Sequence, residues 1–404
     1  MAATVNRRPY FDFMRILAIF FVIWNHTGKT GFALFTIQEP GSLRYWVYVM
    51  ASVFCTFAVP LFFMISGALI LPKTSVRDVW KRRIPKMALI LMGFSLAYHI
   101  LAAAQGDITK YATLNNGLGQ LLNDLPAGSS IAESEDLLNL PSGGLFFTVL
   151  WSGAWNFSFW FLYAYLAFLI SAPLLRTLAE HMRNRHFLYL FLIYFAYKTL
   201  VPILNWTVFG GKYTINPDFQ LNWLSADIFI YPLAGYFLEH RFDIRKVKHE
   251  RWFLPAAWLT VLLLLALAGA LTWRKSLLTG QWNEGACQTF HRIFNLVIAG
   301  TIYVTVKAMF CEPDGTVKAP WGKWSRMLLT SAGACTFGIY LLHVAVLKSD
   351  YWTLTFPVKA DDLGLPLPVV GLIQVLFTLF VCWAVTALWK GGVSLVQSRK
   401  AQKE

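Results

Sequence analysis

Residues 252–273 read WFLPAAWLTVLLLLALAGALTW and contain no charged side chain. As an α-helix this run is roughly 33 Å long at about 1.5 Å per residue, which is enough to cross the hydrocarbon core of a bilayer. Nine further apolar runs are long enough to do the same, so the sequence predicts an all-α integral membrane protein with about ten transmembrane helices. The predicted spans are 11–26, 45–71, 87–104, 157–175, 187–204, 223–238, 252–273, 293–310, 327–347 and 365–389.

The composition excludes an ordinary soluble protein. Of the 404 residues, 57% are hydrophobic, 16% are aromatic and only 14% are charged, which is more apolar surface than a soluble core of this length buries. The formal net charge is +14, but the basic residues lie in short clusters between apolar runs, as they do in cytoplasmic membrane loops. We therefore expect no nucleic-acid partner. The five cysteines are scattered and predict neither a disulfide framework nor a metal site.

The distribution of Lys and Arg predicts the orientation. With the ten spans threaded from a cytoplasmic N-terminus, 24 of the 35 basic residues fall on the cytoplasmic side and ten on the far side, with Arg15 just inside the first span. The positive-inside rule then places both termini in the cytoplasm. Because no small-residue cleavage site follows the first apolar run, we expect it to remain as a span rather than to be removed as a signal peptide.

Two segments do not fit the simple pattern of spans and short loops. The far-side segment 105–144 is long and rich in Gly, Asn, Ser and Pro, and it is either a solvated connector or a lid over a far-side site. Segment 145–155 is apolar but short, so it is a re-entrant or interfacial piece, or the start of a long fourth span. No repeat or separate soluble region is visible, which predicts one transmembrane domain over residues 1–404.

Arg15 and His26 are two ionisable residues within the first predicted span. Eleven residues separate them, which places them roughly 16 Å apart along a helix and about 20° apart around it, so they share a face. Ionisable groups at membrane depth are costly unless they face a cavity or a partner. One cavity could therefore present both residues. Alternatively, Arg15 snorkels to the headgroups and His26 caps the helix at the far interface. We expect Asp12, one turn before Arg15, to balance its charge.

Four motifs in order along the chain resemble acyltransferase family 3, whose members O-acylate cell-envelope polysaccharides and related glycans. Arg15 and His26 match that family's signature of Arg, ten residues and His in the first span. The other three are Val-Pro-Leu-Phe-Phe-Met-Ile-Ser-Gly at 59–67, Phe-Trp-Phe-Leu-Tyr at 159–163 and Phe-Gly-Ile-Tyr-Leu-Leu-His at 337–343. Together they cover essentially the whole chain.

The resemblance implies a membrane O-acyltransferase, and we expect an O-acetyltransferase. It would move an acyl group from cytoplasmic acyl-CoA, with acetyl-CoA as the expected donor, to a hydroxyl of an envelope saccharide or lipid-linked glycan. It also implies a multi-pass protein of the bacterial cytoplasmic membrane, and we expect no metal. A transporter or flippase is the alternative, because intramembrane Arg and His also mark substrate pathways in carriers. The sequence shows no repeated half of the kind that carriers commonly have.

A basic segment before the third predicted span is the expected donor site. The nucleotide end of acyl-CoA is anionic, and Lys81, Arg82, Arg83 and Lys86, with Arg15, are expected to hold its phosphates. The positive-inside rule explains the segment equally well, because cytoplasmic loops of membrane proteins are rich in Lys and Arg without binding a ligand. Relatives often carry Arg-x-x-Arg where this chain has Arg83-Ile-Pro-Lys86, and Lys keeps the charge but loses the planar fork that binds phosphate in a bidentate way.

His26 is the predicted catalytic residue. A neutral imidazole titrates near physiological pH and can take the proton of a hydroxyl as that hydroxyl attacks a thioester, so we expect a general base. A covalent acyl-histidine is the alternative and needs additional steps. We expect His343, late in its span, to meet the far interface. The polar residues expected to orient His26 or the acceptor are Asn25, Ser66, Ser158, Trp160, Tyr163, Asp227 and Tyr340. A helix–helix contact is the simpler interpretation of each taken alone. Ser158 stands where many relatives carry His, so that role is not transferred.

Overall fold

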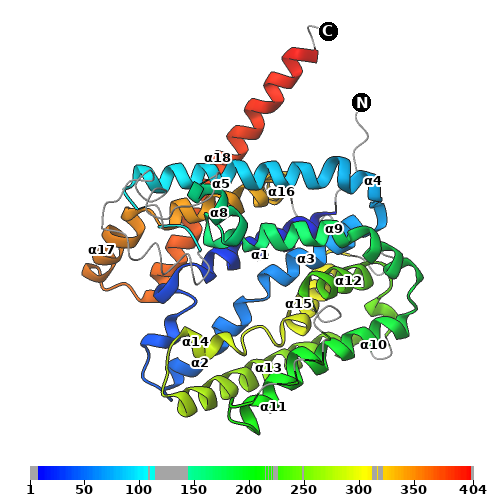
Figure 1. Cartoon of the computed structure of the whole chain (residues 1–404), viewed down its shortest axis with the longest axis vertical. Coiled ribbons are helices and arrows are strands. Elements are labelled where there is room, and N and C mark those ends of the chain that lie inside the picture. Colours follow the sequence, from blue (N-terminus) through cyan, green and yellow to red (C-terminus); the bar gives the residue numbers. More distant parts are fainter. Residues whose placement is uncertain are drawn as a thin grey trace. The chain divides into compact units, whose positions relative to one another are not determined.

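The computed structural model describes residues 8–107, 110–113, 144–213, 226–247, 250–311 and 322–401, with a few single positions between them. Within these residues the regular secondary structure is helical and contains no strand (Figure 1). An isolated bridge joins Thr113 and Ala154. The all-α prediction is therefore confirmed. Most of the far-side segment 105–144, predicted as a connector or lid, lies outside the described residues.

The described part of the chain contains the following α-helices of at least seven residues. Their bounds are α1 (Pro9–Asn25), α2 (Leu43–Cys55), α3 (Ala58–Ile70), α5 (Ile84–Ala104), α8 (Gly144–Ser152), α9 (Trp160–His181), α10 (Asn184–Phe195), α11 (Val201–Thr207), α12 (Asp227–His240), α13 (Glu250–Thr279), α15 (Asn295–Phe310), α16 (Lys323–Leu347), α17 (Phe356–Asp362) and α18 (Leu367–Ala401). Shorter helical pieces are η1 (Gly28–Thr30), η2 (Leu34–Ile37), η3 (Leu71–Lys73), α4 (Val76–Asp78), η4 (Val79–Arg83), η5 (Phe157–Phe159), η6 (Ala196–Leu200), η7 (Ile244–Lys246), α14 (Glu284–Gln288) and η8 (Tyr351–Thr355).

Seven helical runs in the described part of the chain are long and apolar enough to cross a membrane. They are Leu43–Lys73, Val76–Ala104, Phe157–His181, Asn184–Thr207, Glu250–Thr279, Trp324–Leu347 and Leu367–Val393. The other three predicted spans coincide with the shorter helices α1, α12 and α15, of 17, 14 and 16 residues. Each predicted span thus contains helix, while the total of ten and the cytoplasmic position of the termini stay predictions.

Segment 145–155 forms a helix of its own. α8 has nine residues, too few to cross a bilayer, and ends at Ser152. A bridge at Ala154 and the short η5 then precede α9. The segment is therefore not the start of a long fourth span, which was one of the expectations for it.

The described residues form two compact units: a smaller one, Thr74–Leu174, and a larger one made of the chain before and after it. In the smaller unit, α5 packs on α8. The ring of His99 lies 4.1 Å from that of Trp155, centroid to centroid, and the indole Nε1 of Trp155 donates to the carbonyl of Phe146 at 3.0 Å. Aromatic packing thus holds α8 in place.

In the larger unit, α3 and α12 pack with their backbones in contact. A Cβ added to Gly67 would lie 1.9 Å from the carbonyl oxygen of Pro232, and one added to Gly235 would lie 1.9 Å from that of Met64. Helices approach this closely only where a side chain is missing, as in small-residue contacts between membrane helices. Gly67 ends the 59–67 motif, so this part of the motif serves packing.

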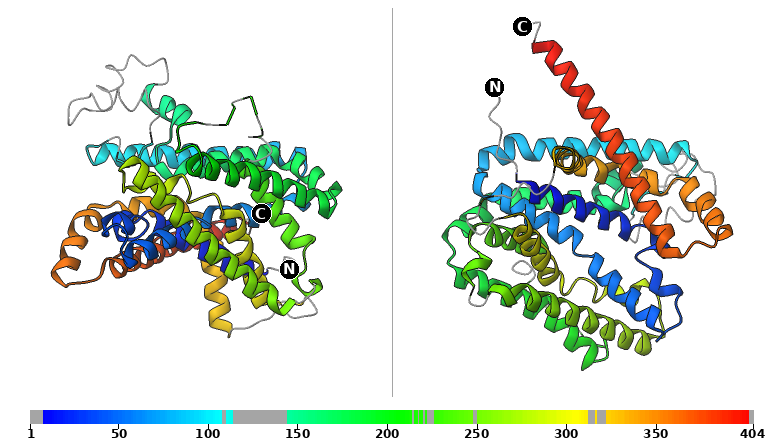
Figure 2. Two further views of the ribbon diagram at one scale, coloured as in Figure 1. Left: turned by 90° about the horizontal axis from the view of Figure 1, so that it is seen from below. Right: turned by 180° about the vertical axis from the view of Figure 1, so that it is seen from behind.

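Glycines also let α16 approach its neighbours α1 and α18, all three of which pack together (Figure 2). A Cβ added to Gly333 would lie 2.5 Å from Cβ of Asp12, and one added to Gly338 would lie 2.4 Å from Cγ2 of Thr386. The close approach of α16 to α1 brings the end of the first helix to residues more than 300 positions later in the chain.

Candidate functional site

The end of α1 places His26 directly against His343 of α16. His26 is the C-cap residue of α1, and its Nδ1 lies 2.8 Å from Nε2 of His343. The two rings are stacked, with centroids 5.1 Å apart and planes inclined by 13°. His343 is fully buried, and its Nδ1 donates to the carbonyl oxygen of Tyr340 at 2.6 Å. Two histidines from opposite ends of the sequence thus form one hydrogen-bonded pair.

This arrangement corrects the expectation for His343. The sequence suggested that His343 meets the far interface, whereas the structure buries it and joins it to His26. The sequence signal was present, since the 337–343 motif ends in this His. Sequence distance hid the contact, because 317 positions separate the two rings.

Asn25 precedes His26 and anchors the end of α1 to the break between α2 and α3. Its Nδ2 donates to the carbonyl of Cys55 at 3.2 Å. Its Oδ1 is buried and has no hydrogen-bond partner among the described residues. A buried acceptor without a donor is uncommon in folded proteins and makes Asn25 a candidate to bind a hydroxyl group.

The neighbouring break between α2 and α3 is held by α15. The Thr56 hydroxyl lies 2.7 Å from the carbonyl oxygen of His291 and 2.8 Å from Oδ1 of Asn295, whose Nδ2 donates back to the Thr56 carbonyl at 3.3 Å. These bonds satisfy backbone groups that the helix break exposes. The end of α1 therefore contacts a fixed segment, in keeping with a site that holds its geometry.

Arg15 lies on α1 toward the helix N-terminus and pairs with Asp12. Its Nη1 is 3.1 Å from Asp12 Oδ1, and the side chains are 27% and 1% exposed. The prediction that Asp12 balances Arg15 is confirmed. The buried Asp12 carboxylate therefore orients the Arg15 guanidinium, and part of the Arg15 side chain stays exposed.

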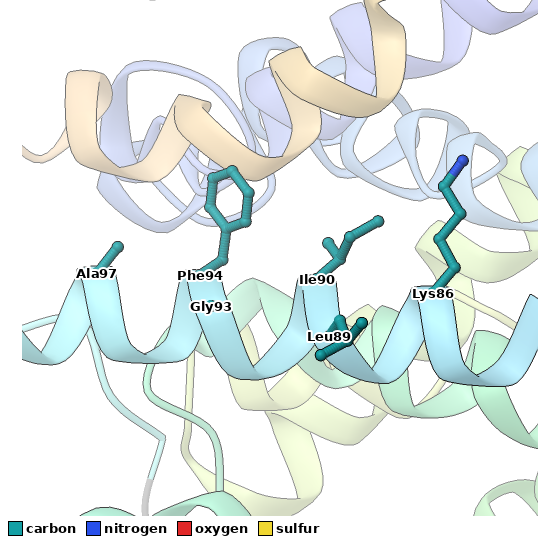
Figure 3. Close-up of a pocket in the computed structure, with 6 residues that line it drawn as sticks. All are labelled: Lys86, Leu89, Ile90, Gly93, Phe94 and Ala97. Atoms are coloured by element: carbon teal, nitrogen blue, oxygen red, sulfur yellow. The ribbon is translucent and has the colours of Figure 1, made fainter.

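The other predicted donor residues belong to the smaller unit, around η4 and the start of α5. Arg83 Nε is 2.5 Å from Asp78 Oδ2, while Arg82 and Lys86 are exposed. An open hollow of about 570 Å³ runs along α5, where Lys86, Ile90 and Phe94 project to the same side (Figure 3). Lipid tails cover apolar helix faces in a membrane, so this hollow does not by itself identify a substrate site.

The remaining predicted polar residues divide between the two units. Tyr163 donates to the carbonyl of Leu150 in α8 at 2.7 Å, and the Ser158 hydroxyl lies 2.9 Å from Asn156 Oδ1, so both hydroxyls have partners within the smaller unit. Tyr340 contacts His343 through its carbonyl. Trp160 is 43% exposed, and Ser66 is half-buried on α3. Among the predicted polar residues, Asn25 is next in sequence to His26, and Tyr340 accepts a hydrogen bond from His343.

A second polar cluster lies at the start of α12. Tyr194 Oη is 3.4 Å from Asp227 Oδ1 and 2.8 Å from Tyr231 Oη. The charges of Lys198 and Arg292 act on Asp227. The sequence singled out Asp227 but not its partners, which come from α10, η6 and the loop before α15.

A buried carboxylate, Glu239 at the end of α12, was missed by sequence reasoning. It bonds to Tyr10 and Tyr303 at 2.7 and 2.9 Å and pairs with Arg8 and Lys307. Lys307 also donates to the carbonyls of Leu238 and Glu239, both at 3.0 Å. These partners neutralise the carboxylate and the end of the helix dipole, so they serve to join α1, α12 and α15.

One comparison with known proteins matched. A family model described as an acyltransferase domain, Acyl_transf_3, matches residues 8–387. The match includes both histidines, Arg15 and the basic segment. No curated protein and no solved structure matched the chain.

Proposed function

The chain belongs to acyltransferase family 3 and is a membrane acyltransferase; we propose that it is an O-acyltransferase of the bacterial cytoplasmic membrane. It transfers an acyl group, in the first instance acetyl, from cytoplasmic acyl-CoA to a hydroxyl of an envelope saccharide or lipid-linked glycan. Both termini lie in the cytoplasm in this proposal, in keeping with the distribution of Lys and Arg.

The observation that carries the proposal is the hydrogen-bonded pair of His26 and His343. A base that a second group orients is the usual arrangement for activating a hydroxyl nucleophile. In the proposed reaction, His26 takes the proton of the acceptor hydroxyl while the oxygen attacks the thioester carbonyl. The carbon–sulfur bond then breaks, and the CoA thiolate leaves and is protonated, which restores neutral His26.

The donor end of the reaction is assigned to basic residues. Arg15 lies eleven residues before His26 on α1, roughly 16 Å along the helix, so it is too far to touch the reacting thioester but suits a charged group at the other end of an extended donor. Arg82 and Lys86 are exposed and Arg83 is partly so. We assign these four cations to the phosphates of acyl-CoA, which charge-assisted hydrogen bonds would hold.

Asn25 is assigned to the acceptor. Its buried Oδ1 has no partner among the described residues and is next in sequence to the base. An acceptor hydroxyl that donated to this oxygen would compensate for a buried polar atom that is otherwise costly. Asn25 would thus bind a hydroxyl group of the glycan close to His26.

The test is acyl transfer by purified protein in lipid nanodiscs. Acetyl-CoA and envelope glycan are supplied without any ion gradient, and mass spectrometry follows free CoA and acetylated glycan. We expect glycan-dependent release of CoA in wild type and none in His26→Ala. Gradient-dependent movement of glycan across vesicles with no release of CoA would contradict the proposal and favour a transporter.

A further inference from the structure

Two consecutive hydrogen bonds connect His26 to His343 and His343 to the carbonyl oxygen of Tyr340. We propose that His343 is a positioning residue, which fixes His26 in the tautomer protonated at Nδ1 and so makes Nε2 the basic nitrogen of the site. This inference rests on the proposed function, because it assigns a reason for the second histidine of the same site.

The first step is set by the Tyr340 carbonyl. A carbonyl oxygen accepts hydrogen bonds and cannot donate them, and it lies 2.6 Å from Nδ1 of His343. The proton of a neutral His343 is therefore on Nδ1. In a neutral imidazole the other nitrogen then carries a lone pair, so Nε2 of His343 is an acceptor.

The second step follows from the contact between the rings. Nδ1 of His26 lies 2.8 Å from this Nε2, so His26 must be the donor and its proton is on Nδ1. The lone pair of neutral His26 is then on Nε2. The nitrogen of His26 that is free to accept a proton is thus determined by a helix carbonyl two hydrogen bonds away.

A doubly protonated His343 would donate to His26 through Nε2, so donor and acceptor would be exchanged. The surroundings of His343 disfavour this charged state. The side chain is fully buried, and its ring nitrogens contact a carbonyl and a histidine, neither of which carries a negative charge. An isolated buried cation is costly under these conditions. Lys348, whose charge acts on His26, adds a further positive charge to the pair.

The same geometry suits the charged state that catalysis creates. After His26 accepts a proton on Nε2, its Nδ1–H still donates to His343, and this bond becomes charge-assisted and stronger. Serine hydrolases orient their histidine with a buried carboxylate. A neutral histidine held by a carbonyl orients the base without burying an acid at membrane depth, where a charge is expensive.

Two substitutions of His343 separate orientation from packing. His343→Gln keeps an amide oxygen that can accept from Nδ1–H of His26, whereas His343→Leu has a similar size and no acceptor. We expect His343→Leu to lower kcat by about 10²-fold or more with little change in the KM for acetyl-CoA or glycan. The kcat of His343→Gln should be at least tenfold higher than that of His343→Leu.

A spectroscopic measurement reports the tautomer without relying on activity. In protein labelled with ¹⁵N-histidine, the His26 signals, assigned by their loss in His26→Ala, should show a protonated Nδ1 and an unprotonated Nε2 near pH 8. In His343→Leu the signals should move toward the opposite tautomer. A wild-type His26 protonated at Nε2 would overturn the inference.

The matched control is His291→Leu, which removes another buried histidine of the larger unit that is 8% exposed. It should retain wild-type kcat. Equal losses in the Leu and Gln variants of His343, or wild-type kcat in His343→Leu, would show that His343 only fills space. The proposed function fails separately, if His26→Ala still transfers acyl groups.

Discussion

Gly67 of α3 lies against the backbone of Pro232 in α12, so closely that a Cβ at position 67 would come within 1.9 Å of the Pro232 carbonyl oxygen. Backbone atoms cannot rotate away as a flexible side chain can. The two helices must therefore separate to admit even a methyl group, and both belong to the core of the larger unit.

We accordingly expect Gly67→Ala to destabilise the protein strongly. Overpacking typically costs about 1–3 kcal/mol, and a contact with backbone should lie at or above the upper end. Gly93→Ala on α5 is the control, because nothing lies within 4 Å of a Cβ at that position. Thermal unfolding in detergent should show a lower Tm for Gly67→Ala and an unchanged or higher Tm for Gly93→Ala. Equal Tm values would contradict the close approach of α3 and α12.

His26→Ala should abolish acyl transfer while leaving acyl-CoA binding largely intact. A general base contributes about 10²–10⁴-fold, and His26 lies about three helical turns from Arg15, so the loss should appear in turnover rather than in donor affinity. Single-turnover kinetics and calorimetric binding of acetyl-CoA measure the two effects separately. A correctly inserted alanine variant that transfers acyl groups near the wild-type rate would exclude His26 as the base.

Neutralising Arg15 or Arg83 with Gln should weaken acyl-CoA binding by roughly 1–3 kcal/mol, as for other charge-assisted contacts. The control is Arg176→Gln, which removes a half-exposed cation paired with Glu180. Arg15→Lys separates the effect of the charge from that of the planar guanidinium, because Lys keeps a positive charge near Asp12 but lacks the paired N–H donors of Arg. Unchanged affinity for acyl-CoA in both Gln variants would show that these residues only set the membrane orientation or snorkel to the lipid headgroups.

The predicted orientation is tested by single-cysteine labelling in a variant whose five native cysteines are replaced. A cysteine introduced in segment 105–144 should react with an impermeant maleimide added outside intact cells. One introduced in 241–246 should react only after the membrane is opened. The reverse pattern would invert the topology and remove the basis for a cytoplasmic donor site.

His291 should make the protein less stable in mild acid. Burial, together with the neighbouring positive charge of Arg292, lowers the pKa of His291 from 6.5 to about 4. Since the unfolded chain binds this proton more readily, the stabilisation is fully present above about pH 6.5 and is lost as pH falls toward 4. His291→Leu should therefore lose less Tm than wild type between pH 7.5 and 4.5. Parallel curves would show that His291 titrates normally.

The amino-acid sequence by itself determined the class of the protein and the residues worth testing. Hydropathy depends on residues near one another in the chain, so apolar runs such as 252–273 predicted helices that the structure contains. Helical periodicity likewise placed Asp12 beside Arg15, three residues away on α1, and the four motifs indicated the family that the match over residues 8–387 shows.

Tertiary structure alone decided which of those residues meet. Nothing local relates His26 to His343, because their contact depends on α16 approaching α1 where Gly333 leaves room for Asp12. Tertiary structure also decided that the Tyr163 hydroxyl bonds to α8 and the Ser158 hydroxyl to Asn156. It likewise showed that Glu239 is a buried carboxylate paired with Lys307. A helix can be recognised from its own residues, whereas a hydrogen bond between helices requires the packing of both. Which ring nitrogen of His26 carries the proton therefore depends on the tertiary structure.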